Sequence, residues 1–123
     1  MTKPTYQDAG ILLKVARLGV EMNLGEITGW IYSDQFTPDF EEFTKKYSPD
    51  SEEANKVRSA LMWYETIGTL YKNGLFNEEL LFDWLAVRPM WERLKSLALG
   101  QRERSGNPRM FENFEALVKA ETK

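Results

Sequence analysis

The sequence predicts an all-α fold, a single compact bundle of about five to seven helices around one central helix. Apolar residues recur along most of the chain at the three- and four-residue spacing of amphipathic helices. No segment alternates polar and apolar positions with β-branched residues, the pattern typical of strands. The length of 123 residues suits one domain, residues 1–123, which can bury a core without disulfides.

The first two helices are predicted from local signals at their ends. Thr5 can cap a helix that runs to about Met22, with Asp8 three residues after the cap. Asn23 and Glu26 have the spacing of a capping box, so the chain is expected to turn at Asn23 into a short second helix.

Two Ser/Thr-Pro pairs predict the next helix starts. Thr37-Pro38 is expected to begin a short third helix, because proline suits the first helical position. Ser48-Pro49 repeats the signal and is expected to begin the central helix, predicted at about residues 49–73.

The central helix enters the densest apolar stretch of the chain, Ser59–Trp84. Its apolar residues form two adjacent rows: Val57, Leu61, Tyr64, Gly68, Tyr71 and Leu75, and beside them Ala60, Trp63, Ile67 and Leu70. A stripe this wide predicts neighbours on two sides. Gly68 lies inside the stripe, where glycine costs about 1 kcal/mol relative to alanine, so we expect another helix backbone to approach it closely. Asn73-Gly74 is expected to end the helix with Gly74 in the left-handed conformation.

The helix after the central one is predicted at Glu78–Val87, capped by Asn77. Arg88-Pro89 is expected to break or kink it.

Two further helices complete the prediction. One runs to about Arg104 and ends at Ser105-Gly106. The last is expected to begin at Asn107-Pro108.

Composition excludes many catalytic chemistries. The chain contains neither cysteine nor histidine. It therefore lacks the groups for Ser-His-Asp and Cys-His catalysis and for nearly every common zinc, copper or haem site. We assign no cofactor and no catalytic residue, and we expect the protein not to be an enzyme.

The net charge of −3 gives no overall attraction to nucleic acid or to an acidic membrane. No run of about 18 apolar residues predicts insertion into a bilayer, and residues 1–10 do not resemble a secretion signal. We therefore expect a cytoplasmic location. The charge is unevenly distributed: residues 24–86 carry a net −7 and residues 87–123 a net +3. Such opposite charges can attract each other or a second copy.

The carboxylates Glu78, Glu79 and Asp83 are the best candidates for a metal site. Glu79 and Asp83 share a helix face and could hold magnesium together with water and a phosphate. We favour the alternative that they are solvated acids near a helix N-terminus, so no metal site is assigned.

Three arginines surround the turn at residues 105–108: Arg102, Arg104 and Arg109. Guanidinium groups beside a helix N-terminus are typical of an anion site. The favoured alternative is a solvated turn whose arginines pair with Glu103 or Glu112.

Five aromatic residues are candidates for a ligand pocket or a protein interface: Trp30, Trp63, Tyr64, Trp84 and Trp91. Aromatic residues at helical spacing more often belong to a core. Any that remain exposed are more typical of a protein interface than of a ligand pocket.

An ordered set of residues resembles a bacterial domain family of unknown function over about residues 57–118. It comprises Trp63-Tyr64-Glu65, Ile67-Gly68, Leu70-Tyr71, Gly74-Leu75, Asn77-Glu78-Glu79-Leu80, Trp91, Leu94, Arg102, Gly106-Asn107-Pro108-Arg109, Phe111, Asn113-Phe114-Glu115 and Leu117. Many relatives carry an N-terminal membrane helix before this domain, and this sequence shows none. The resemblance implies an all-helical fold and supplies no catalytic residue, ligand or partner.

Three functional hypotheses follow. The first is a non-enzymatic interaction or regulatory module that binds a protein partner or self-associates. The second is a small-ligand-binding domain with an aromatic or arginine-lined pocket. The third is a metal-dependent phosphate-ester enzyme that uses Glu78, Glu79 and Asp83.

Overall fold

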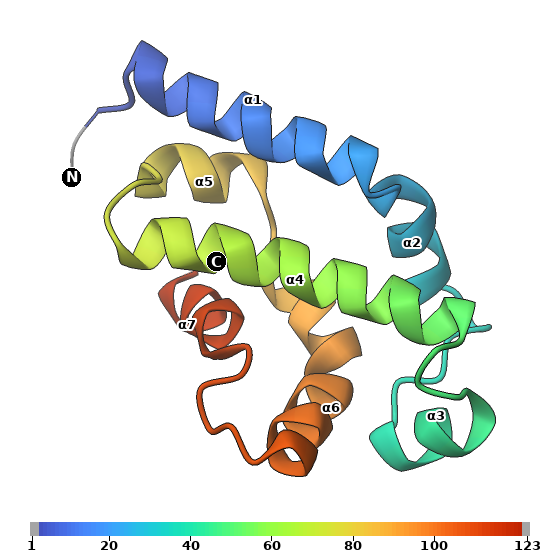
Figure 1. The fold of residues 1–123 in the computed structure, drawn as a ribbon. Helices are drawn as coiled ribbons and strands as arrows, with labels where there is room; N and C mark the ends of the chain where they lie inside the picture. The colour runs from blue at the N-terminus through green and yellow to red at the C-terminus, as the bar shows by residue number, and fades with distance from the viewer. Residues whose placement is uncertain (1–2, 122–123) are drawn as a thin grey trace.

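The computed structural model describes residues 3–121, and this part of the chain forms seven α-helices and no strand. The helices are α1 (Tyr6–Glu21), α2 (Leu24–Ile31), α3 (Phe40–Lys46), α4 (Glu52–Lys72), α5 (Glu78–Trp84), α6 (Arg88–Ser105) and α7 (Glu112–Ala120). Helix α4 crosses the middle of the molecule, with α1 and α5 on one side and α6 and α7 on the other (Figure 1). The predicted all-α bundle around a central helix is confirmed.

Helix α4 supplies the centre of the core, because both of its predicted apolar rows are buried over most of their length. Its buried residues are Val57, Ala60, Leu61, Trp63, Tyr64, Ile67 and Gly68. Helix α6 adds Met90, Leu94 and Leu97, and α7 adds Phe114 and Leu117. A stripe this wide contacts helices on both sides, as its width predicts.

The predicted close approach at Gly68 is confirmed, because α7 passes directly over it. A Cβ atom added at Gly68 would collide with the backbone carbonyl of Asn113 and lie 2.9 Å from the Asn113 Cβ. Only glycine lets the two helix backbones come so close.

Helix ends with a strong local signal fall where the sequence predicts them. The Thr5 hydroxyl accepts a hydrogen bond from the Asp8 N–H at the start of α1. The side chain of Asn77 accepts one from the Leu80 N–H at the start of α5. Gly74 and Gly106 end α4 and α6 with a positive φ of 73°, the left-handed conformation in which glycine is unstrained.

The starts predicted at Thr37-Pro38 and Ser48-Pro49 are wrong by two or three residues. Helix α3 is capped by Asp39, whose carboxylate accepts a hydrogen bond from the Glu42 N–H at 3.1 Å. Helix α4 is capped by Ser51 in the same way. In each case a capping residue just after the proline supplies the acceptor, so the proline lies in the preceding turn.

The capping box predicted at Asn23 and Glu26 is also wrong. Asn23 adopts the left-handed conformation, with a φ of 61°, and its side chain makes no capping hydrogen bond. Its amide instead donates to the Glu26 carboxylate at 3.0 Å. The predicted change of direction at Asn23 nevertheless occurs.

Arg88-Pro89 begins a helix and does not break one. Helix α5 ends at Trp84, and the chain is extended at Leu85 before α6 starts at Arg88. Pro89 therefore lies in the first turn of α6, where its missing N–H has no helical partner to lose.

The last helix starts at Glu112 and not at the predicted Asn107-Pro108. The Asn107 side chain accepts a hydrogen bond from the Arg109 N–H at 3.0 Å, which forms a turn. Residues 107–111 consequently lead into α7 without belonging to it.

Candidate functional site

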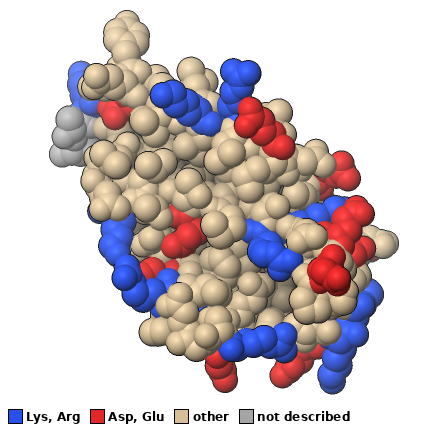
Figure 2. All heavy atoms as spheres, in the orientation of Figure 1, with Lys and Arg blue, Asp and Glu red and all other residues tan. Residues whose placement is uncertain are grey.

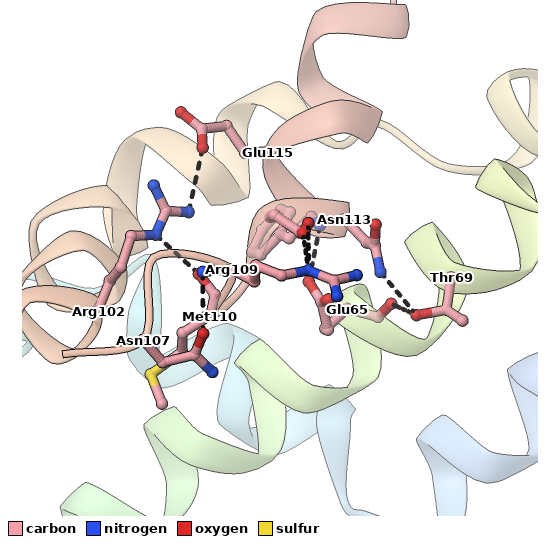
Figure 3. A network of polar contacts seen from close by, with 10 residues as sticks. Glu65, Thr69, Arg102, Asn107, Arg109, Met110, Asn113 and Glu115 are labelled. Atoms are coloured by element: carbon pink, nitrogen blue, oxygen red, sulfur yellow. Dashed lines mark hydrogen bonds and ion pairs between the residues drawn. The ribbon is translucent and has the colours of Figure 1, made fainter. Parts of the chain in front are cut away.

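A network of polar contacts holds the first turn of α7 against α4 (Figure 3). The Glu65 carboxylate on α4 accepts a hydrogen bond from the Phe114 N–H at 2.9 Å. The Thr69 hydroxyl accepts one from the Asn113 side-chain amide at 3.1 Å. Phe111, the residue before α7, makes no side-chain cap. Glu65 therefore caps α7 from another helix, with the sign of charge that a helix N-terminus favours.

Partial burial raises the pKa of the Glu65 carboxyl group, because desolvation disfavours its charged form. Hydrogen bonds from Phe114 and Asn113 act in the opposite direction. A raised carboxyl pKa is a property of general acids and bases. The contacts of Glu65, however, are those of a helix cap, so we interpret it as a structural group.

The three candidate arginines have separate partners. Arg102 donates to the Met110 carbonyl at 2.8 Å and pairs with Glu115 at 3.1 Å (Figure 3). Arg109 pairs with Glu112 at 3.0 Å, and this pairing lowers the pKa of the Glu112 carboxyl group.

The Arg104 guanidinium lies 4.8 Å from the centre of the Phe40 ring. It therefore faces α3, whereas Arg102 reaches the loop before α7 and Glu115 within α7. The helix N-terminus expected at Asn107-Pro108 lies instead at Glu112, where α7 starts.

The candidate aromatic residues belong to the core or pack against it. Trp63, Tyr64 and Trp91 are buried, and Trp30 and Trp84 are half-buried. The indole N–H of Trp63 donates to the Val15 carbonyl at 3.0 Å, which fixes α1 on α4. Tyr64 stacks on Phe114 at 4.8 Å, and burial raises the pKa of its hydroxyl.

The three acidic candidates on α5 do not form a metal site with their neighbours. Glu78 accepts a hydrogen bond from the Tyr71 hydroxyl at 2.6 Å, which raises the pKa of Tyr71 to about 12. Glu79 and Asp83 are exposed. Among residues 3–121, no group of three or more Asp, Glu, His or Cys residues is arranged to hold a metal ion.

A partly open cavity of about 380 Å³ lies between α3, the first turns of α4 and the second half of α6. We call it the α3 pocket; its principal lining residues are Phe40, Phe43, Tyr47, Arg58, Leu97 and Arg104. Its volume falls within the range of about 300–1,000 Å³ typical of ligand pockets. Of the candidates chosen from the sequence, only Arg104 contributes to it.

The outer face of α1 carries exposed apolar side chains. Tyr6, Leu13 and Val20 are 98%, 66% and 79% exposed. Their seven-residue spacing aligns them along one side of the helix, and we call them the α1 stripe. The opposite side of α1 faces the core through Val15 and Gly19. Figure 2 shows large areas of uncharged side chains on one face of the molecule, with charged side chains both at its margin and within it.

A model of one family, described as a domain of unknown function (DUF4760), matches residues 5–120. The chain belongs to this family. No curated protein and no solved structure matches the chain. No helix within residues 3–121 of this DUF4760 domain combines the length and the apolar character needed to cross a membrane.

Four of the residues that carry the family resemblance hold α4, α6 and α7 together in this DUF4760 domain. Glu65 caps α7, Gly68 admits its backbone, and Trp91 packs on Phe114 at 5.0 Å. Arg102 anchors the loop before α7 through the Met110 carbonyl. These residues therefore have packing and capping roles, and the α3 pocket and the α1 stripe lie outside them.

Sequence reasoning missed the long-range caps of this DUF4760 domain. The buried carboxylate of Glu121 accepts hydrogen bonds from the N–H groups of Val87 and Arg88 and so caps α6. Arg93 donates to the carbonyls of Ile31 and Ser33 at the end of α2. Partners more than thirty residues apart leave no local pattern in the sequence. The aromatic wall of the α3 pocket, in contrast, is indicated by the sequence, because Phe40, Phe43 and Tyr47 recur at helical spacing.

Proposed function

We propose that this DUF4760 domain is a non-enzymatic interaction module that self-associates through the outer face of α1. The observation that carries the proposal is the α1 stripe, three large apolar side chains left in solvent on one helix face. A seven-residue apolar spacing is the pattern by which two helices pack along each other.

The stripe is self-complementary about a two-fold axis through Leu13. In an antiparallel pair of α1 helices, Leu13 meets its own copy, and Tyr6 of each chain faces Val20 of the other. An interface of this kind is isologous, the arrangement of most two-fold dimers. Gly10 supports the approach of a second helix, because the space in front of its Cα is open.

Charge does not oppose this pairing. Arg17 lies on the same side of α1 and pairs with Glu21 at 3.8 Å, so the two charges partly cancel. A helix of 16 residues is about 24 Å long. Two such helices side by side form an interface at the small end of the specific class, so the proposed dimer is weak and depends on concentration.

Sedimentation velocity over a dilution series from about 5 to 500 μM tests the proposal, because weak interfaces dissociate in this range. We expect the sedimentation coefficient of the wild type to rise with concentration. Leu13→Glu should remain monomeric, since it places two like charges opposite each other on the axis. Leu75→Glu is the matched control, because Leu75 is 58% exposed in the turn after α4.

A wild type that stays monomeric throughout the series would refute the self-association. Equal loss of association in Leu13→Glu and Leu75→Glu would refute its assignment to α1. The proposal includes a cytoplasmic location in a bacterial host, which cell fractionation of that host would test.

A further inference from the structure

We infer that the α3 pocket binds a small amphipathic carboxylate, with its apolar body among the aromatic rings and its head group at Arg104. This site is independent of the α1 stripe, which lies on another helix. The inference rests on the shape, lining and charge of the pocket.

The walls of the pocket suit an apolar body. Phe40, Phe43 and Tyr47 line it from α3, and Leu97 lines it from α6. Pockets for small molecules are typically apolar and aromatic, with few polar groups that fix the orientation of the ligand. The cavity of about 380 Å³ has room for a compact ligand and not for a folded partner.

The charged groups of the pocket are both cationic. Arg58 and Arg104 line it, and no Asp or Glu residue does so. Within residues 3–121, neither arginine has a carboxylate partner within the 4.0 Å of an ion pair. Two uncompensated guanidinium groups beside an apolar cavity favour an anion over a cation or a neutral ligand.

Arg104 is the better placed of the two for direct contact with the head group. Arg58 already donates to the Pro49 carbonyl at 2.8 Å and to the Asn55 side chain at 2.7 Å. The Arg104 guanidinium is held over the Phe40 ring and donates no hydrogen bond to another described residue. Its donors therefore remain for a carboxylate, which a guanidinium can bind through two hydrogen bonds.

The aromatic wall is fixed before any ligand binds. The Phe40 N–H donates to the Ser96 hydroxyl at 2.9 Å. The Phe40 ring fills the space beside Gly100, where an added Cβ would lie 2.6 Å from ring atom Cδ1. A wall held in this way loses little conformational freedom on binding, and this favours affinity.

The test is a titration of the ¹⁵N-labelled full chain with sodium octanoate, followed by amide chemical shifts in two-dimensional NMR spectra. We expect saturable shifts at α3 and at the second half of α6. 1-Octanol has the same apolar body without charge, and acetate has the charge without the body. Both should bind at least about tenfold more weakly, the ratio expected when a charge-assisted hydrogen bond or the apolar burial is lost.

Arg104→Gln should weaken octanoate binding by about tenfold or more, since it removes a charge-assisted contact. Arg17→Gln, on α1, is the matched control and should leave octanoate binding unchanged. Circular dichroism spectra of both variants show whether each is folded as the wild type. A second variant, Gly100→Ala, displaces the Phe40 ring without changing any charge and should also weaken binding.

Three results would overturn the inference. The first is a spectrum that octanoate leaves unchanged up to millimolar concentration. The second is octanol binding as tight as that of octanoate. The third is an Arg104→Gln variant that is folded as the wild type and binds octanoate with unchanged affinity.

Discussion

Replacement of Gly68 by alanine tests the contact between α4 and α7 most severely. The added Cβ would collide with the Asn113 backbone, which cannot move aside as a flexible side chain can. Overpacking of a core contact costs about 1–3 kcal/mol. A shift of α7 would also weaken the hydrogen bond from Phe114 to Glu65, worth about 1.5–3 kcal/mol for a charged acceptor. Alanine returns about 1 kcal/mol of helix propensity, so we expect a net loss of stability of about 1.5–5 kcal/mol.

Urea unfolding monitored by tryptophan fluorescence measures this loss, because Trp63 and Trp91 are buried in the native state. At about 4 °C per kcal/mol for a chain of this size, the thermal midpoint should fall by about 6–20 °C. Gly29→Ala in α2 is the matched control, since nothing lies within 4 Å of a Cβ added there. The free energy of unfolding of Gly29→Ala should exceed that of the wild type by up to about 1 kcal/mol. The reasoning fails if Gly68→Ala is as stable as the wild type or more stable.

Two further predictions concern the long-range caps. The raised pKa of Glu65 means that the native state binds this proton more tightly than the unfolded state, so stability should fall as pH rises above the ordinary value of 4.5 through the raised pKa. Glu65→Gln should flatten that part of a plot of thermal midpoint against pH, and parallel curves for variant and wild type would contradict the assignment. Glu121→Ala removes the acceptor for the N–H groups of Val87 and Arg88 and should cost about 2–4 kcal/mol in urea unfolding. Glu121→Gln keeps one acceptor oxygen and should cost less; a fully stable Glu121→Ala would show that α6 needs no cap.

Local signals predicted the parts of the fold that depend on neighbouring residues. Two helices begin where expected, at the caps Thr5 and Asn77, and two end where expected, at Gly74 and Gly106. Each of these residues acts on backbone groups within a few residues of itself. The helix starts predicted from prolines were wrong because a proline is acceptable both in the first turn of a helix and in the turn before it. Only the position of the hydrogen-bond acceptor decides between these two.

The last helix could not be placed from sequence, because its cap comes from another helix. Glu65 lies 49 residues before Phe114, so no sequence pattern near α7 predicts this cap. The same applies to Glu121 at the start of α6. The close approach of another helix at Gly68 could be predicted, because a glycine in an apolar stripe needs a compensating contact. The sequence did not identify α7 as the helix that makes this contact.

The candidate site residues show a similar limit. Arg102, Arg104 and Arg109 are close in sequence, yet Arg104 lies on the face of α6 toward α3. The α3 pocket combines residues from three helices, so its lining depends on tertiary packing. The aromatic side of α3 was visible in the sequence, but its pairing with Arg58 and Arg104 was not.

Cysteine cross-linking tests the proposed pairing of α1 most directly, because the natural chain contains no cysteine. Leu13→Cys places one thiol on the proposed two-fold axis, whereas Val20→Cys places it opposite Tyr6 of the other copy. Under mild oxidation we expect covalent dimers of Leu13→Cys, and little cross-linking of Val20→Cys or of the control Leu75→Cys. Equal cross-linking of all three variants, or a Leu13→Cys protein that remains monomeric, would contradict the pairing.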